Sequence, residues 1–108
     1  MYYWIIEQNL ELQKLYKVFL ISQGHKVECF LSTEAALQFL KSKNIKPDIC
    51  VIDSPLQNEY HLSELIQKLD SFSQIIFSIS DFEARVMLRG IPSIILEKPF
   101  RLKELLSS

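Results

Sequence analysis

The segment from Ile49 to Ile52 restricts the fold of this chain more than any other. It reads Ile-Cys-Val-Ile without an alternating polar residue, follows Lys46-Pro47, and stops at Asp53. A short apolar run of this kind is typical of a strand that is covered on both faces. Such a strand belongs in the middle of a parallel sheet with helices on either side.

The rest of the chain alternates strand-like and helix-like segments. We expect strands at Tyr2–Ile6, Lys26–Phe30, Ile49–Ile52, Ile75–Ile79 and Ser93–Leu96. We expect helices at about Leu10–Ser22, from a cap at Ser32 or Thr33 to Leu40, at Leu62–Leu69, at Asp81–Arg89, and a short one at Leu102–Leu106. This alternation predicts one α/β domain over residues 1–108, with a five-stranded parallel sheet and helices on both faces.

Composition and charge argue against several classes of function. The formal net charge is -1, with 12 Lys and Arg spread among 13 Asp and Glu, so no basic patch favours nucleic acid. No apolar run approaches the roughly 20 residues that span a bilayer, and the start lacks the basic stretch of a signal peptide, so we expect a cytoplasmic protein. Cys29 and Cys50 stand far apart in apolar segments and predict buried free thiols.

Polar residues follow several of the expected strands. In an open parallel sheet, ligands bind beyond the carboxyl ends of the strands. The residues at these ends are Glu7, Gln8, Asp53, Ser80 and Lys98. Two carboxylates, a hydroxyl and an ammonium would therefore meet at one edge. Carboxylates at close quarters repel unless a cation lies between them, and hard oxygen atoms suit Mg²⁺.

The same residues carry a resemblance to a known family. Taken in order, three segments are similar to motifs of the response-regulator receiver domain, the CheY-like module: Ile5-Ile6-Glu7-Gln8-Asn9, Lys46-Pro47-Asp48-Ile49-Cys50-Val51-Ile52-Asp53 and Glu97-Lys98-Pro99-Phe100. The resemblance covers essentially the whole chain. It implies a flavodoxin-like, doubly wound fold with strand order 2-1-3-4-5, and a cis peptide bond between Lys98 and Pro99.

The resemblance also implies a role in two-component phosphorelay signalling. Asp53 would accept a phosphoryl group from a sensor histidine kinase or a phosphotransfer protein, which is nucleophilic catalysis by a carboxylate. Ser80 would donate a hydrogen bond to a phosphoryl oxygen, and Lys98 would pair with the phosphoryl group. A downstream protein would be the target, and a homodimer is a further option. The chain would be a signalling module and not an enzyme.

A divalent cation belongs to the same expectation. By the resemblance, Mg²⁺ would be held by Glu7 and Asp53, with Gln8 and the backbone carbonyl of Pro55 as further candidate ligands. Gln8 stands where the family usually has a second acid, so the affinity for Mg²⁺ should be reduced because hard cations favour anionic oxygen.

Two more positions depart from the family pattern. Asp81 stands where the family prefers a very small residue, and Ile95 replaces the aromatic residue that usually lies three positions before the lysine. With Gln8, these departures favour an atypical receiver of reduced phosphorylation competence. The alternative is a pseudo-receiver, a protein-interaction module that acts without phosphorylation, in which Lys98 neutralises the two carboxylates.

Overall fold

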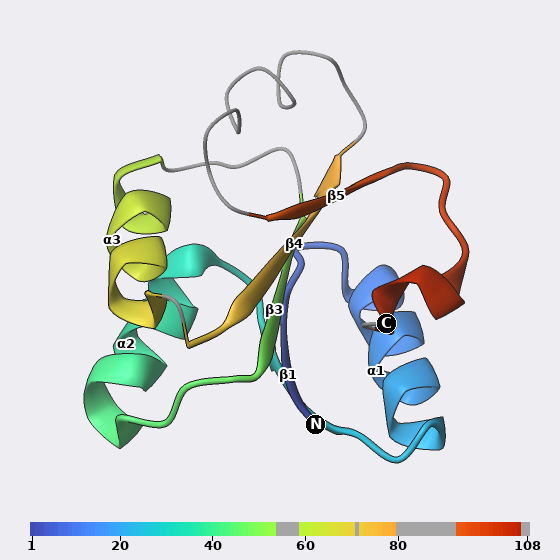
Figure 1. The fold of residues 1–108 in the computed structure, drawn as a ribbon, viewed down its shortest axis with the longest axis horizontal. Helices are drawn as coiled ribbons and strands as arrows, with labels where there is room; N and C mark the ends of the chain where they lie inside the picture. Colours follow the sequence, from blue (N-terminus) through green and yellow to red (C-terminus); the bar gives the residue numbers. More distant parts are fainter. Residues whose placement is uncertain (54–58, 71, 80–92, 107–108) are drawn as a thin grey trace.

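The computed structural model describes residues 1–53, 59–70, 72–79 and 93–106, and shows alternating strands and helices (Figure 1). Their order and bounds are β1 (Tyr2–Ile6), α1 (Leu10–Ser22), β2 (Lys26–Phe30), α2 (Thr33–Lys43), β3 (Ile49–Asp53), α3 (Glu59–Leu69), β4 (Gln74–Ile79), β5 (Ile94–Glu97) and a 3₁₀ helix, η1 (Leu102–Leu105). The bounds of β1, α1 and β2 are those that the sequence predicts.

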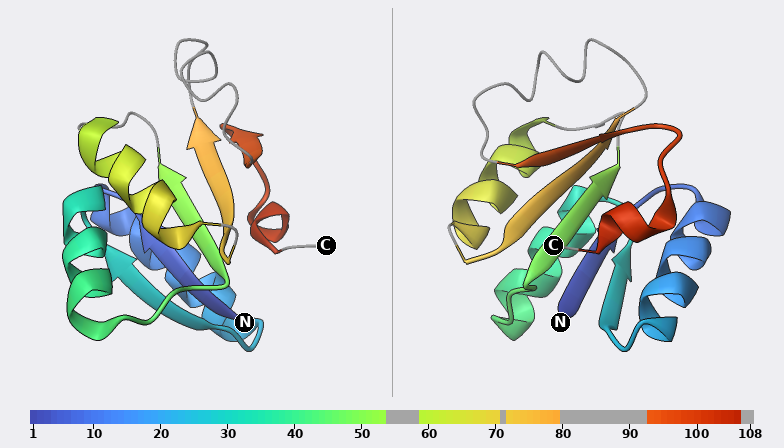
Figure 2. Two further views of the ribbon diagram at one scale, coloured as in Figure 1. Left: turned by 60° about the vertical axis from the view of Figure 1, so that its left-hand side comes forward. Right: turned by 45° about the vertical axis from the view of Figure 1, so that its right-hand side comes forward.

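The five strands form one parallel sheet in the order β2-β1-β3-β4-β5, which confirms the expected topology. Strand β3 is central, and its residues from Ile49 to Ile52 are at most 2% exposed. Helices α2 and α3 cover one face of the sheet, and α1 and η1 cover the other (Figures 1 and 2). The apolar run of β3 is therefore buried on both faces, as its lack of alternation predicts.

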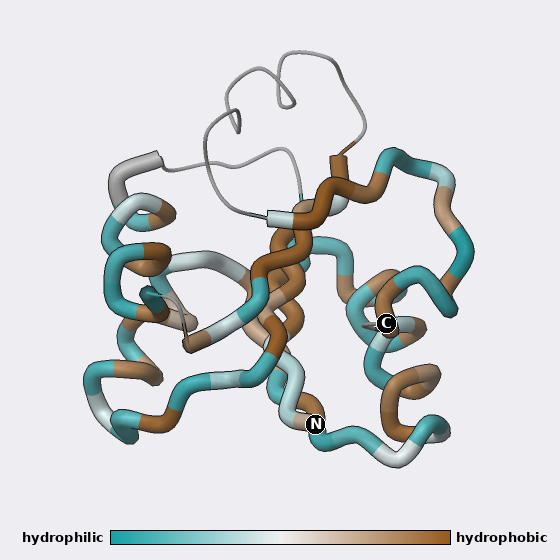
Figure 3. Tube along the Cα trace, viewed as in Figure 1, coloured by the Kyte–Doolittle hydropathy of each residue, from teal (hydrophilic) through white to brown (hydrophobic). Residues whose placement is uncertain are grey.

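Each face of the sheet has its own hydrophobic core. Because successive side chains of a strand point to opposite faces, Trp4, Cys50 and Phe77 pack beneath α2 and α3, whereas Ile5 and Val51 pack on the side of α1. Figure 3 shows this concentration of hydrophobic residues along the central strands. The same alternation determines which residues at the strand ends face α1.

Side-chain caps begin two of the helices. The Asn9 side chain accepts hydrogen bonds from the backbone amides of Glu11 and Leu12, at 3.0 and 3.1 Å, and so begins α1. The hydroxyl of Ser32 accepts one from the amide of Ala35 at 3.1 Å, which identifies Ser32 as the N-cap of α2. Both helices therefore start where short polar side chains satisfy the first free amides.

The structure corrects several expected boundaries. Helix α3 begins at Glu59, three residues before the first apolar residue of its buried face, and β5 covers Ile94–Glu97 instead of Ser93–Leu96. The last short helix is a 3₁₀ helix that ends at Leu105. The expected helix at 81–89 lies outside the described residues. No helix in the described ranges is long and apolar enough to cross a membrane.

Candidate functional site

The carboxyl ends of β1, β3 and β5 bring together three residues that the sequence predicts as site residues. Glu7 directly follows β1, Asp53 ends β3, and Lys98 directly follows β5. The backbone of Glu7 donates to the carbonyl of Phe30 at 3.0 Å, and that of Lys98 donates to the carbonyl of Ile79 at 2.8 Å. These bonds extend the sheet past the strand ends and hold the two residues at its edge.

Asp53 and Lys98 form an ion pair at this edge. The Lys98 ammonium contacts Oδ1 of Asp53, and the two side chains are 25% and 16% exposed for Lys98 and Asp53 respectively. Partial burial strengthens the attraction because little water screens it. The peptide bond between Lys98 and Pro99 is cis, as the resemblance implies. The predicted meeting of Asp53 and Lys98 is therefore confirmed.

Glu7 is the most enclosed charged residue of the site. It is 2% exposed, and its carboxyl group hydrogen-bonds the carboxylate of Asp53 and lies against the backbone amide of Gln8. Burial, together with the neighbouring Asp53 carboxylate, raises the pKa of Glu7 from 4.5 to about 8, although Lys98 acts in the opposite direction. Glu7 therefore keeps its proton at neutral pH when no cation is bound.

Ser78 lies beside Asp53 and was missed by the sequence analysis. In the register of β3 and β4, Asp53 is the partner of Ser78, and Ile6 of β1 is the partner of Ile52, which places Glu7 next to Asp53 on the other side. We call Glu7, Asp53 and Ser78 the polar row. The available signal was a lone hydroxyl residue inside the apolar run from Ile75 to Ile79.

Helix α1 covers the polar row. Its Tyr16 is 5% exposed, and burial together with the negative charge of Glu7 and Asp53 raises the pKa of Tyr16 to about 12. The Tyr16 ring stacks on Phe100 with centroids 6.0 Å apart, and the Gln13 amide donates to the backbone carbonyl of Glu7 at 3.3 Å. The site thus lies beneath α1, at the carboxyl edge of the sheet.

Solved structures share this arrangement of strands and helices. A response regulator receiver protein from Sinorhizobium medicae is 23% identical, with a TM-score of 0.80 over 97% of this chain and 87% of that chain. A receiver domain protein from Clostridium thermocellum is 14% identical, with a TM-score of 0.80 over 96% and 86%. This chain has the receiver-domain fold. NtrX from Brucella abortus, at 19% identity and a TM-score of 0.78, matches 96% of this chain, which spans only 24% of NtrX.

The sequence itself gives no match at the level of families. No family model matches it, and no curated protein matches it. Because these three solved structures are below 25% identical, the comparison shows a shared fold and no more.

Among the remaining predicted residues, Gln8 is exposed and directly follows the buried Glu7. Ile95 is half-buried and packs against the core beneath α2 and α3. Ser80, Asp81 and Pro55 lie outside the described residues. The structure therefore assembles Glu7, Asp53 and Lys98 from the predicted set and adds Ser78.

The polar row offers the oxygen atoms that Mg²⁺ prefers. Both carboxyl oxygens of Glu7 and Oδ1 of Asp53 are enclosed, and Oδ1 also contacts the Lys98 ammonium. Mg²⁺ is usually held by one or two carboxylates with water completing its shell, so this pair of residues fits it. The described part of the chain holds no group of three acidic, His or Cys side chains around one point. A bound Mg²⁺ would have to displace the proton of Glu7.

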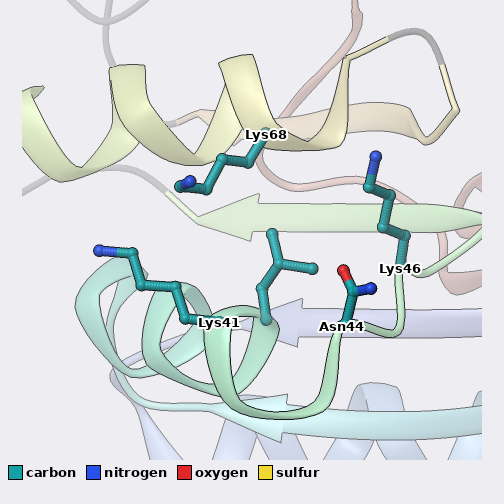
Figure 4. Close-up of a pocket in the computed structure, with 5 residues that line it drawn as sticks. Lys41, Asn44, Lys46 and Lys68 are labelled. Carbon is teal, nitrogen blue, oxygen red and sulfur yellow. The ribbon is translucent and has the colours of Figure 1, made fainter.

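A pocket lies at the edge of the sheet opposite the ion pair of Asp53 and Lys98. It has a volume of about 250 Å³ and lies between α2 and α3, lined by Leu40, Lys41, Asn44, Lys46 and Lys68 (Figure 4). Lys41 and Lys68 stand in the last turns of their helices, where a positive charge is stabilised by the free carbonyl groups. Lys41 also pairs with Glu64 at 3.0 Å. The helix ends account for the positions of Lys41 and Lys68.

Proposed function

We propose that this chain is an atypical receiver domain of a two-component pathway, which accepts a phosphoryl group on Asp53 with reduced competence. The ion pair between Asp53 and Lys98 carries the proposal. It places a nucleophilic carboxylate and a cation together at the carboxyl edge of the sheet, where ligands of such folds bind. The receiver-domain fold of the chain supports the same role.

The proposed reaction transfers a phosphoryl group from a phosphohistidine of a histidine kinase or phosphotransfer protein. A carboxylate oxygen of Asp53 attacks the phosphorus atom, the bond between phosphorus and nitrogen breaks, and its electron pair stays on the imidazole. The product is an aspartyl phosphate. The Lys98 ammonium then has a phosphoryl oxygen to pair with. Ser80, which lies outside the described residues, is proposed to donate a hydrogen bond to another.

Reduced competence is expected from the state of the polar row. A Mg²⁺ ion held by Glu7 and Asp53, with Gln8 and the Pro55 carbonyl as further candidates, supplies charge neutralisation at the transferring group. Glu7 keeps a proton at neutral pH, and Gln8 carries no charge. Both features lower the affinity of this chain for Mg²⁺. We therefore propose weak Mg²⁺ binding and slow phosphorylation.

One observation favours a second candidate, the pseudo-receiver. With Glu7 protonated and Asp53 paired with Lys98, the charges of the site are balanced without a metal or a phosphoryl group. Such a site suits a protein-interaction module whose partner recognises a single conformation of the domain, without phosphorylation. Both candidates are signalling modules with a downstream protein partner, and either can act as a homodimer.

A titration with a phosphoryl mimic distinguishes the two candidates. Beryllofluoride is added to the protein at increasing Mg²⁺ concentration, and amide NMR shifts are recorded, with Asp53→Ala as the control. Phosphorylation competence predicts saturable shifts centred on Asp53 and Lys98 that are absent in the variant. If millimolar Mg²⁺ with the mimic leaves the spectrum unchanged, the phosphorylation proposal fails and the interaction module is left.

A further inference from the structure

We propose that Ser78 is a positioning residue: its side chain turns from the rotamer of the structure, in which Oγ has no partner among the described residues, donates a hydrogen bond to the carboxylate of Asp53, and holds it for attack on the phosphodonor. The role in phosphorylation rests on the proposed function, but the hydrogen bond itself does not. Ser78 belongs to no motif that the resemblance identified, and it lies two residues before Ser80 in the sequence.

The first argument is the burial of the hydroxyl. Ser78 is 0% exposed, and its Oγ has no hydrogen-bond partner among the described residues. An enclosed hydroxyl without a partner is costly, and such groups are rare in folded proteins. Among the enclosed side-chain polar atoms without a partner in the described ranges, only Oγ of Ser78 and Nε1 of Trp4 are not carboxyl oxygens of the hydrogen-bonded pair Glu7 and Asp53. The unsatisfied group of the polar row is therefore the Ser78 hydroxyl, beside Asp53.

The second argument is the register of the sheet. Ser78 and Asp53 are paired across β4 and β3. Registered side chains of neighbouring parallel strands project from the same face, and their strands lie about 4.8 Å apart. Ser78 pairs on its other side with Leu96, which has no polar side-chain atom. Asp53 is thus the polar neighbour that the sheet offers to this hydroxyl.

The chemistry of the two groups is complementary. Rotation about the Cα–Cβ bond of Ser78 moves Oγ between staggered positions, and the hydroxyl hydrogen can then turn toward an acceptor. Oδ1 of Asp53 is enclosed and contacts the Lys98 ammonium, and the Asp53 carboxylate hydrogen-bonds the carboxyl group of Glu7 on its other side. A donor from β4 would restrict the rotation of the Asp53 side chain, on the side opposite Glu7. Ser78 would then act through Asp53 without touching the phosphoryl group.

Three substitutions at Ser78 separate a positioning role from a packing role. Ser78→Ala removes the hydroxyl, Ser78→Cys keeps a similar volume with a poor donor, and Ser78→Thr keeps the hydroxyl. Ser73→Ala is the matched control because Ser73 is also buried, but its hydroxyl donates to the carbonyl of Pro47 at 2.6 Å, at the far edge of the sheet. Thermal unfolding establishes that each variant is folded.

Two readouts are compared in these variants. The first is the ¹³C resonance of the Asp53 carboxyl carbon, recorded without phosphodonor or Mg²⁺. The second is the rate of phosphorylation by a small acyl phosphate at saturating Mg²⁺. We expect the Ala and Cys variants to shift the resonance and to react about tenfold more slowly, the effect of one lost hydrogen bond to a charged group. Ser78→Thr and Ser73→Ala should behave like the unsubstituted protein.

The outcomes are distinguishable from a failure of the proposed function. If the unsubstituted chain takes up no phosphoryl group, the proposed function fails, and the Asp53 carbon resonance alone still decides whether the hydrogen bond exists. An unchanged resonance in folded Ser78→Ala and Ser78→Cys overturns the proposal. Unchanged phosphorylation rates in both variants overturn the positioning role. If Ser78→Thr does not fold, the Cys variant decides, because its volume is close to that of serine.

Discussion

Lys98 and Asp53 form an ion pair although their strands are not neighbours in the sheet. β4 runs between β3 and β5, so the lysine side chain reaches across the end of β4 to contact the carboxylate. Ser78 is a residue of that intervening strand. The two charges and the hydroxyl thus belong to three successive strands, and a change in one of them is expected to affect the others.

Lys98→Met should destabilise the protein and abolish its phosphorylation. The substitution keeps the apolar stem but leaves the carboxylate of Asp53, whose side chain is 16% exposed, without its cation. Breaking a partly buried ion pair at one partner should lower the free energy of unfolding by about 2 kcal/mol. Urea denaturation measures the loss. Lys41→Met is the control, because the exposed pair of Lys41 with Glu64 is worth less than about 1 kcal/mol. Equal stability of the two variants would contradict this prediction.

Glu7→Gln should remove a destabilisation that grows with pH. The pKa of Glu7 is about 8 in the folded chain against 4.5 as its ordinary value, so the folded chain binds the proton more tightly than the unfolded chain. Stability therefore falls as the pH rises from 4.5 to 8, by about 5 kcal/mol from this group. The loss of stability is absent below pH 4.5 and complete above pH 8.

Denaturation at pH 5 and pH 8.5 tests this sign. The Gln variant should match the unsubstituted protein at the lower pH and be more stable at the higher one. Glu28→Gln, a change at an exposed carboxylate of β2, is the matched control and should keep the pH dependence of the unsubstituted protein. A Glu7→Gln variant with an unaltered pH dependence would show that the carboxyl group is not held in its protonated form.

The sequence predicted the sheet well because its strands are short apolar runs between helices with clear periods. The start of α1 at Leu10 was predicted from its apolar period, and the predicted end of β3 at Ile52 falls one residue short of Asp53. The meeting of Asp53 and Lys98 followed from the rule that parallel strands end at one edge. Local patterns were therefore sufficient for the fold and for part of the site.

The rest of the site could not be predicted because it depends on depth and register. A glutamate after a strand reads as a solvated end or a ligand, and only its burial in the folded chain raises the pKa of Glu7 to about 8. Ser78 reads as one polar residue in an apolar strand, and only the pairing of β3 with β4 places it beside Asp53. Helix α3 begins before its apolar face, so its start at Glu59 has no hydrophobic signal.

Tyr3→Phe should loosen η1 from the sheet. The Tyr3 hydroxyl donates to the carbonyl of Leu105 at 3.0 Å, and both residues are 0% exposed. Removing the donor leaves a buried carbonyl without this bond, which should cost about 1–2 kcal/mol. Thermal denaturation measures the cost. Tyr2→Phe is the matched control on the same strand, because Tyr2 is only half-buried, and a change within about 0.5 kcal/mol is expected there. Equal losses in the two variants would argue against the hydrogen bond.

The affinity for Mg²⁺ should increase with pH up to about pH 8. Glu7 must lose its proton before it can hold a cation, and its pKa is about 8. Below that value, each unit by which the pH falls should weaken Mg²⁺ binding about tenfold, because proton and cation compete for one carboxylate. Calorimetric titration at pH 6.5, 7.5 and 8.5 measures the affinity, and repetition in buffers of different ionisation enthalpy counts the released protons.

Glu7→Gln provides the control for this competition. The variant has no proton to release at this position, so its Mg²⁺ affinity should be weak and nearly independent of pH over the same range. Release of about one proton per cation near pH 7 by the unsubstituted protein, and of none by the variant, would identify Glu7 as the titrating ligand. An affinity that stays constant with pH in the unsubstituted protein would mean that the cation is held without Glu7. Within the polar row, Asp53 alone would then bind Mg²⁺, and the buried Glu7 would stay protonated and uncharged.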